Sequence, residues 1–316
     1  MPDANPNAAR MIVTTRIFDA PRALVFDAFS DPGHLARWWG PNGFRTTTSR
    51  FDFREGGIWR FVMHGPDGRD YENCITYREI KPPERLVYHH GDGEGVETIS
   101  FENVLTFEDL GGRTRLTMEA TFPSAELRDR VIRDHKADEG GAQHLARLSE
   151  YLEADVFTIS RRLAAPRDLV WKMWTEAEHL ARWWGPKGFA WLSGTIDLRP
   201  GGIFHYGVKS PGGAEMWGRF VFHDIVAPER LSFVNSFSNA EGGITRAPFF
   251  ADWPLEVFNT LTLTEDGDGT LVTLRGAPIN ASEDERTRYR SNHASMEYGF
   301  GAALNALEAY LKDVEG

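Results

Sequence analysis

The chain has 316 residues, of which 41% are hydrophobic, and a formal net charge of −11. This size fits two domains with ordinary apolar cores. The acidic balance argues against a nucleic-acid partner, which needs a basic surface. The lone Cys74 cannot form an intrachain disulfide, and no apolar run is long enough for a membrane span. We therefore expect a cytoplasmic protein.

The first residues predict a strand followed by two short helices. Residues 1–10 are polar and contain two prolines, so we expect them to be disordered. Met11–Phe18 is rich in β-branched residues and predicts a strand. Pro21 suits the first turn of a helix, and Asp31-Pro32 predicts the start of a second helix that ends at Gly40-Pro41.

Segments of alternating polarity follow, separated by turns rich in glycine and proline. Within Ile58–His64, the side chains of Trp59, Phe61 and Met63 share one face, which we expect to point toward the closing helix. The same alternation predicts further inward-facing sets: Leu86, Tyr88 and His90, then Phe101, Asn103, Leu105 and Phe107, then Leu116, Met118 and Ala120.

Helical periodicity returns at the end of this half. Ser124 can cap a helix that begins at Ala125. The helical pattern resumes after Gly140-Gly141, through Leu145, Leu148 and Leu152. The order of predicted elements is therefore a strand, two short helices, about six strands and a long helix.

The whole pattern then occurs a second time. His34–Pro41 and His179–Pro186 are identical, and residues 14–86 align with 159–231 without a gap, with 28 identities in 73 positions. A period this long predicts a duplicated domain, so we expect domains at residues 11–154 and 155–316. The equivalent inward-facing sets are Phe204, Tyr206 and Val208, then Leu231, Phe233 and Asn235, then Val257, Asn259, Leu261 and Leu263, then Val272, Leu274 and Gly276.

Two helix starts in the second copy carry their own signals. Thr175-Glu-Ala-Glu178 predicts a capping box at the start of the second short helix. Ser282 is the predicted cap of the closing helical region, whose apolar face contains Leu304, Leu307 and Leu311.

The combined motifs resemble those of one known family. They are the Trp-Trp-Gly-Pro-x-Gly-Phe segment, the Asp-x-Arg-x-Gly-Gly turns that begin at Asp52 and Asp197, and the Pro-Glu-Arg-Leu segments that end at Leu86 and Leu231. They resemble the family named for homology to the activator of heat-shock protein 90 ATPase, in the helix-grip superfamily of START and birch-pollen allergen-like domains. This resemblance implies an α+β fold of two helix-grip domains. Each would be a curved antiparallel sheet around a long C-terminal helix, with an apolar cavity between them.

That cavity makes the inward-facing residues candidates for ligand binding. We expect one tryptophan of each pair to anchor the short helix and the other to line the cavity. A buried amide must be hydrogen-bonded, so Asn103 and Asn259 are either tied to protein or water, or they are polar anchors for a ligand. His90 is either satisfied by protein groups or binds ligand. The candidates are Trp39, Trp59, Phe61, Met63, Tyr71, Tyr88, His90, Asn103, Met118, Trp184, Phe204, Tyr206, Phe233, Asn235, Asn259 and Leu274.

The sequence contains no motif for catalysis, for a metal or for a cofactor. Its histidines are scattered, and no nucleophile has a neighbouring base. Two Asp/Arg pairs, Asp52 with Arg54 and Asp197 with Arg199, predict ion pairs that stabilise turns. We expect no resident metal or cofactor, while a cyclase-like or hydrolase-like enzyme that uses polar cavity residues stays an alternative.

The copies differ most where the second gains 11 residues between Ser236 and Pro254. Its Phe249, Phe250 and Trp253 are too apolar for an idle surface loop. They can be covered by the cavity mouth of their own domain, by the first domain or by another molecule. We predict a lid over the cavity mouth, framed by Gly242-Gly243 and Pro248.

The leading functional interpretation is a cytosolic protein that binds a small apolar or amphipathic molecule. The family name suggests an alternative, a module that regulates a chaperone ATPase through its outer surface during a stress response. We also predict unequal cavities, because Phe204 and Gly218 replace Trp59 and Asn73 and because only the second copy has the aromatic insertion. The ligand and the oligomeric state stay open at this stage.

Overall fold

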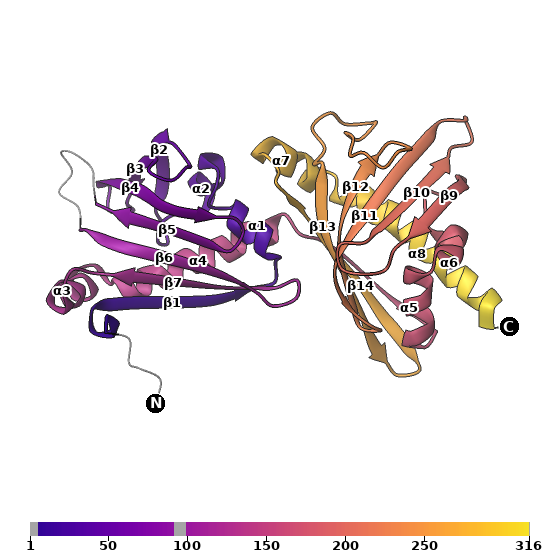
Figure 1. The fold of residues 1–316 in the computed structure, drawn as a ribbon, viewed down its shortest axis with the longest axis horizontal. Helices are drawn as coiled ribbons and strands as arrows, with labels where there is room; N and C mark the ends of the chain where they lie inside the picture. The colour runs from indigo at the N-terminus through magenta and orange to yellow at the C-terminus, as the bar shows by residue number, and fades with distance from the viewer. Residues whose placement is uncertain (1–5, 92–98, 316) are drawn as a thin grey trace. The chain divides into compact units, whose positions relative to one another are not determined.

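The computed structural model describes residues 6–91 and 99–315. The chain forms two compact units, Met1–Ala154 (domain 1) and Asp155–Gly316 (domain 2). Figure 1 shows the same succession of elements in each of them. Each domain is described by itself below.

Domain 1 is a seven-stranded antiparallel sheet with helices after its first and last strands, and its strand order is β1-β7-β6-β5-β4-β3-β2. The elements in chain order are η1 (Ala8–Arg10), β1 (Met11–Phe18), α1 (Arg22–Asp27), α2 (Pro32–Trp38), β2 (Arg45–Phe51), β3 (Ile58–His64), β4 (Asp70–Lys81), β5 (Arg85–His90), β6 (Phe101–Asp109), β7 (Thr114–Thr121), α3 (Ala125–His135) and α4 (Ala137–Ala154).

Domain 2 repeats this topology, with the strand order β8-β14-β13-β12-β11-β10-β9. Its elements are β8 (Phe157–Leu163), α5 (Arg167–Thr175), α6 (Ala177–Trp183), β9 (Ala190–Ile196), β10 (Ile203–Lys209), β11 (Glu215–Val226), β12 (Arg230–Ser238), β13 (Glu256–Asp266), β14 (Gly269–Ile279), α7 (Glu283–Ser291) and α8 (His293–Glu315). Two helix-grip domains, as predicted, are therefore present.

The predicted strand register is also present. Trp59 and Phe61 of β3 are each 2% exposed, and Phe204 of β10 is fully buried. Their neighbours Arg60 and His205 lie on the other face and are partly exposed. A slip of one residue would have exchanged these two sets, so the hydrophobic alternation fixed the inner face of the sheet.

Both predicted turn ion pairs form. Arg54 lies 3.0 Å from Asp52, and Arg199 lies 2.9 Å from Asp197. In each turn the backbone N–H of the arginine also donates to the carbonyl of the aspartate, at 3.0 Å. These residues therefore act locally, within the turn that leads into β3 or β10.

The helices differ from the sequence prediction in three places. The capping box at Thr175–Glu178 is wrong: the hydroxyl of Thr175 donates to the carbonyl of Trp171 at 2.8 Å, and no side chain caps α6. The closing helical region of domain 1 breaks at Lys136, which has a left-handed φ of 50°, and Gly140-Gly141 lies inside α4. Of the N-terminal segment expected to be disordered, Ala8–Arg10 forms a turn of helix, and residues 1–5 lie outside the described residues.

The paired tryptophans divide their roles in the same way in both domains. The indole N–H of Trp38 donates to the carbonyl of Ala28, and that of Trp183 donates to the carbonyl of Met173, both at 3.0 Å. Each bond joins the second short helix to the end of the first one. The following tryptophan, Trp39 or Trp184, then turns toward the space between sheet and closing helix.

In domain 1, α4 holds the loop that follows Trp39. The backbone N–H of Gly40 donates to Nε2 of His144 at 2.9 Å. Arg147 donates to the carbonyls of Gly40 and Pro41 at 2.9 and 3.0 Å, and Gln143 accepts from the N–H of Asn42 at 3.1 Å. We call these contacts the α4 clasp.

Domain 2 has no equivalent of the α4 clasp. Leu145, Leu148 and Leu152 correspond to Leu304, Leu307 and Leu311, an offset of 159 residues along the closing helix. Equal ring contacts support this alignment: His34 lies 6.1 Å from Tyr151, and His179 lies 5.9 Å from Tyr310. Alanines therefore replace the three polar residues of the α4 clasp, at Ala302, Ala303 and Ala306.

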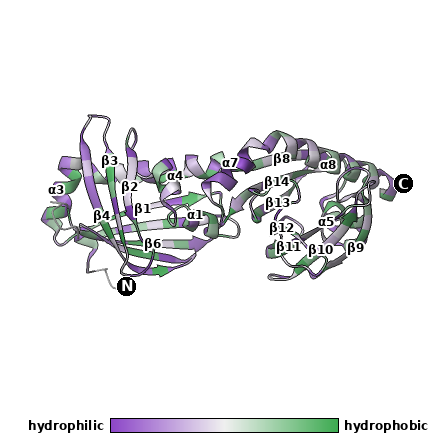
Figure 2. Ribbon diagram, turned by 90° about the horizontal axis from the view of Figure 1, so that it is seen from above, coloured by the Kyte–Doolittle hydropathy of each residue, from purple (hydrophilic) through white to green (hydrophobic). Residues whose placement is uncertain are grey.

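The aromatic insertion of domain 2 packs on α7, a strongly hydrophilic helix that is mostly purple in Figure 2. The ring of Trp253 lies 5.5 Å from that of Tyr289, and the guanidinium of Arg288 lies 4.8 Å from the centre of the Phe250 ring. Arg288 also forms an ion pair with Asp252 at 2.9 Å. Contacts to α7 therefore order this segment.

A buried ion pair joins α7 to the start of domain 2. The side chains of Asp155 and Arg286 are both fully buried and 2.9 Å apart, and Arg290 contacts the other carboxylate oxygen of Asp155. Taking these charges out of water is costly, so each depends on the other for compensation. No helix in the described part of the chain is long and apolar enough to cross a membrane.

Replacing Asp155 with Asn should leave the buried guanidinium of Arg286 without its counter-charge. We expect the Asp155→Asn variant to lower the free energy of unfolding of domain 2 by about 3–5 kcal/mol, measured by hydrogen exchange of buried amides in β8 and β14. Asp266→Asn, which breaks an exposed pair with Arg162 at 3.1 Å, is the matched control and should change it by less than about 1 kcal/mol. Equal losses in both variants would contradict this account.

The α4 clasp should make domain 1 sensitive to acid. Burial lowers the pKa of His144 to about 4 from its ordinary value of 6.5. Between pH 4 and pH 6.5, His144 therefore binds a proton in the unfolded chain but not in the folded domain. The contribution of neutral His144 to the stability of domain 1 is fully present above pH 6.5 and is lost as the pH falls toward 4.

Between pH 7 and pH 5, this single group should lower the free energy of unfolding of domain 1 by about 2 kcal/mol. His144→Gln keeps an acceptor for the N–H of Gly40 and removes the titration. Its domain 1 should lose about 2 kcal/mol less than the wild type over the same interval, measured by hydrogen exchange of amides in β1 and β7. An identical loss in both proteins would exclude His144 as the source.

Candidate functional site

Domain 1 contains a cavity of about 840 Å³ between its sheet and its closing helices. Strands β1, β3, β4, β5, β6 and β7 provide one wall, and α3, α4 and Trp39 provide the other. Eight of the nine candidates predicted for this domain line it: Trp39, Phe61, Met63, Tyr71, Tyr88, His90, Asn103 and Met118. The inward alternation of the strands thus converges on one space.

Trp59 is the candidate of domain 1 that does not line the cavity. It is 2% exposed, its ring stacks on that of Phe61 at 3.9 Å, and its indole N–H donates to the hydroxyl of Thr48 at 3.0 Å. The face assignment was therefore correct, but Phe61 and Trp39 cover this ring. Trp59 supports the wall from behind.

Asn103 and Tyr88 are polar residues of the cavity lining that contact each other. The amide of Asn103, which is 4% exposed, donates from Nδ2 to the hydroxyl of Tyr88 at 2.7 Å. Its Oδ1 has no hydrogen-bond partner among the described residues. Burial raises the pKa of Tyr88, so its hydroxyl stays protonated. Two residues that line the cavity, Asn103 and Tyr88, thus hold an amide group and a phenolic hydroxyl side by side.

His90 is held by protein groups at both ring nitrogens. Nδ1 lies 3.0 Å from the carbonyl of Ile99, and Nε2 lies 2.9 Å from Oδ1 of Asn73. Its ring stacks on that of Phe101 at 4.7 Å, and burial lowers its pKa. These contacts match the expectation of a satisfied histidine.

Sequence reasoning missed the part of the lining that comes from the helices. The missed residues include Val131, Ala137, Gly141 and His144 of α3 and α4, and Ile12 and Thr14 of β1. Gly141 allows the close approach of α4 to β1, because a Cβ atom there would lie 2.6 Å from Oγ1 of Thr14. Aligning the closing helices of the two copies on their leucines would have singled out the positions on α4, though not those on β1.

Domain 2 holds much less space between its sheet and α8. Its interior cavity measures about 240 Å³ and is lined in part by Trp184, Tyr206, Met296 and Phe300. Leu274 borders a separate space of only about 10 Å³. Phe204, Phe233 and Asn259 are buried and line neither space, and Asn235, half-buried, does not line them either.

Larger side chains account for this difference. Phe157, Met296 and Phe300 stand where domain 1 has Ile12, Ala137 and Gly141. The ring of Phe300 lies 5.6 Å from that of Phe157 and 6.3 Å from that of Trp184. The reason given for unequal cavities, Phe204 and Gly218, was therefore incomplete, because α8 fills most of the space.

The amides of domain 2 satisfy one another. Nδ2 of Asn259 donates to Oδ1 of Asn235 at 3.0 Å and to the carbonyl of Val257 at 2.9 Å. Phe233 occupies the position of Tyr88, so the hydroxyl that accompanies Asn103 in domain 1 is missing. This pair is tied within the protein.

The candidate lid residues lie elsewhere. Phe249, Phe250 and Trp253 line neither interior space of domain 2 described above. Phe249 is 55% exposed, and its ring lies 5.3 Å from that of Phe237, which does border the larger space. Phe250 and Trp253 contact Arg288 and Tyr289 of α7, and Trp253 packs in the same apolar cluster as Met296 and Phe300.

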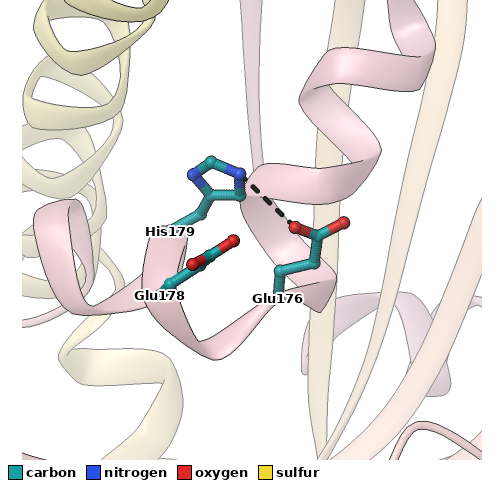
Figure 3. Close-up of side chains that lie close together, drawn as sticks. All are labelled: Glu176, Glu178 and His179. Carbon is teal, nitrogen blue, oxygen red and sulfur yellow. Dashed lines mark ion pairs between the residues drawn. The ribbon is translucent and has the colours of Figure 1, made fainter.

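Glu176, Glu178 and His179 form a cluster at the start of α6, shown in Figure 3. Nε2 of His179 lies 3.4 Å from Glu176, and Nδ1 lies 3.0 Å from the hydroxyl of Tyr310. Both ring nitrogens thus have protein partners. The cluster links α6 to α8 through these contacts.

Solved structures with similar folds come from several bacteria. Protein Ms6760 from Mycobacterium smegmatis is 27% identical, over 51% of this chain and 92% of that one, with a TM-score of 0.43. A protein from Arthrobacter aurescens is also 27% identical, over 48% of this chain and 90% of that one, with a TM-score of 0.44. The di-domain ARO/CYC BexL from the BE-7585A biosynthetic pathway is 12% identical, over 95% of this chain and 98% of that one, with a TM-score of 0.35.

No curated protein matches the chain. A family model does match, and it matches twice, at residues 19–153 and 164–312. These two matches coincide with the two helix-grip domains and together span most of the chain. The chain therefore belongs to the family described as Activator of Hsp90 ATPase homolog 1-like protein, of which it carries two copies in tandem.

Proposed function

We propose that this chain is a binding protein that holds a small apolar or amphipathic molecule in domain 1. The cavity of about 840 Å³ carries this proposal. Pockets for small molecules commonly measure about 300–1,000 Å³ and combine an apolar wall with a few polar groups. The cavity of domain 1 has both properties.

Cavity volume and the polar groups of the lining also distinguish domain 1 from domain 2. Between its sheet and α8, domain 2 offers about 240 Å³, which falls below that common range. Rings of α8 and β8 fill the space there, and the two amides of this domain bond to each other. A second pocket of domain 2, about 650 Å³, lies beside α6 and α8 and is lined in part by the charged side chains of Arg161, Arg182, Lys187 and Glu297. We therefore assign ligand binding to domain 1 and a closed core to domain 2.

A cytoplasmic setting accompanies this proposal. Cys74 is the single cysteine of the chain and is 1% exposed, and a chain with one cysteine cannot form an intrachain disulfide. The proposed ligand is thus a molecule that reaches the protein in a reducing compartment.

Filling the cavity of domain 1 with the side chains of domain 2 tests the proposal. Ile12→Phe combined with Ala137→Met reproduces Phe157 and Met296. The full chain is titrated with the neutral fluorescent probe N-phenyl-1-naphthylamine. The double variant should bind it at least about tenfold more weakly than the wild type, because the added atoms occupy the volume that the probe needs.

Val13→Phe is the matched control, since Val13 follows Ile12 in β1 and is 56% exposed on the opposite face. It should bind the probe as the wild type does. Phe300→Ala combined with Met296→Ala should open domain 2 and add a second probe site per chain. Equal binding by the wild type and the filled variant would refute the assignment to domain 1.

A further inference from the structure

Asn103 and Tyr88 leave two hydrogen-bonding groups available to a ligand, and this inference rests on the binding function proposed above. Asn103 lines the cavity, and its buried Oδ1 has no partner among the described residues. The hydroxyl of Tyr88 accepts from Nδ2 of Asn103 at 2.7 Å. Its own hydrogen is therefore directed elsewhere, and no acceptor in the described part of the chain takes it.

An unsatisfied buried amide oxygen costs free energy, so the site favours a ligand that donates to it. The neighbouring phenol favours a ligand oxygen that accepts. One hydroxyl group meets both needs, because its oxygen accepts from Tyr88 while its hydrogen bonds to Oδ1 of Asn103. The rest of the lining is mainly aromatic and aliphatic, as expected for an apolar ligand body.

The charges of the lining exclude an anionic ligand. None of the described lining residues is Lys or Arg, and the rim carries the carboxylates of Asp70 and Glu72. Burial lowers the pKa of both histidines of the cavity, His90 and His144, so both are neutral near pH 7. A buried carboxylate or phosphate would have no counter-charge.

We propose that domain 1 binds a neutral, mainly apolar alcohol or phenol whose hydroxyl group bonds to Tyr88 and Asn103. The oxygen of that hydroxyl accepts from the phenol of Tyr88, and its hydrogen is donated to Oδ1 of Asn103. Domain 2 lacks this site, because Phe233 replaces Tyr88 and Asn259 is already bonded to Asn235 and Val257.

Four naphthalene derivatives of similar shape test the proposal by competition with N-phenyl-1-naphthylamine on the full chain. They are 2-naphthol, 2-methylnaphthalene, 2-acetylnaphthalene and 2-naphthoate. We expect 2-naphthol to bind about tenfold more tightly than 2-methylnaphthalene, since it forms the missing hydrogen bonds. The acceptor-only ketone should lie between them, and the anion should bind most weakly.

Two variants test whether Asn103 causes the preference for 2-naphthol over 2-methylnaphthalene. Asn103→Leu keeps the branched shape of the side chain without its polar atoms and should abolish the advantage of 2-naphthol, with the affinity for 2-methylnaphthalene unchanged within about twofold. Asn259→Leu is the matched control, because it makes the same change at the equivalent amide of domain 2, which lines neither interior space of that domain. It should leave the tenfold preference intact. If Asn103→Leu does not fold, the ranking of ligands by the wild type still decides the matter.

The outcomes separate this inference from the proposed function. Equal affinities for 2-naphthol and 2-methylnaphthalene, with the fluorescent probe still bound, would overturn the inference and leave the apolar cavity function standing. A preference for 2-acetylnaphthalene over 2-naphthol would mean that the amide nitrogen of Asn103 faces the cavity, which also overturns it. Failure of the fluorescent probe itself to bind would refute the proposed function and the inference together.

Discussion

The hydrogen bond from the first tryptophan of each pair to the preceding helix is the constraint on which both domains depend. Trp38 reaches the carbonyl of Ala28, and Trp183 reaches that of Met173, at the same distance of 3.0 Å. A buried indole N–H needs an acceptor, and this one closes the corner between the two short helices. Because this bond fixes the corner, the second tryptophan points toward the closing helix.

Both domains share this corner, but their interiors differ because different residues face inward from the closing helix. Small residues of α4 leave space above the sheet of domain 1, and the α4 clasp, whose His144 lines that space, holds the loop after Trp39. In domain 2 the alanines of α8 make no such polar contacts, while Phe300 and Met296 enter the interior. A few positions on one helix therefore separate a cavity from a filled core.

The buried polar groups of the two domains also differ. In domain 1, the amide of Asn103 donates to a tyrosine, and its buried oxygen has no partner among the described residues. In domain 2, the equivalent amide meets another amide and a carbonyl, so its donors are used within the protein. A buried polar group left without a partner is costly in a closed core and useful in a cavity that a ligand completes.

The sequence by itself determined the duplication, the order of elements, the inner face of each strand and the turn ion pairs. These features depend on local patterns, such as alternation along Ile58–His64 or the exact repeat at His34–Pro41. Because a strand has a period of two, each residue type reports its face directly. That rule assigned six residues of the domain 1 cavity to inner faces: Phe61, Met63, Tyr88, His90, Asn103 and Met118.

The tertiary structure decided which inner faces enclose a space. Whether Trp59 lines a cavity or supports its wall depends on Phe61 and Trp39 covering it, and whether domain 2 is open depends on rings from α8. The insertion was likewise decided by α7, whose Tyr289 and Arg288 are more than thirty residues away along the chain. Periodicity tells which way a side chain points, whereas the volume left in front of it is set by elements distant in sequence.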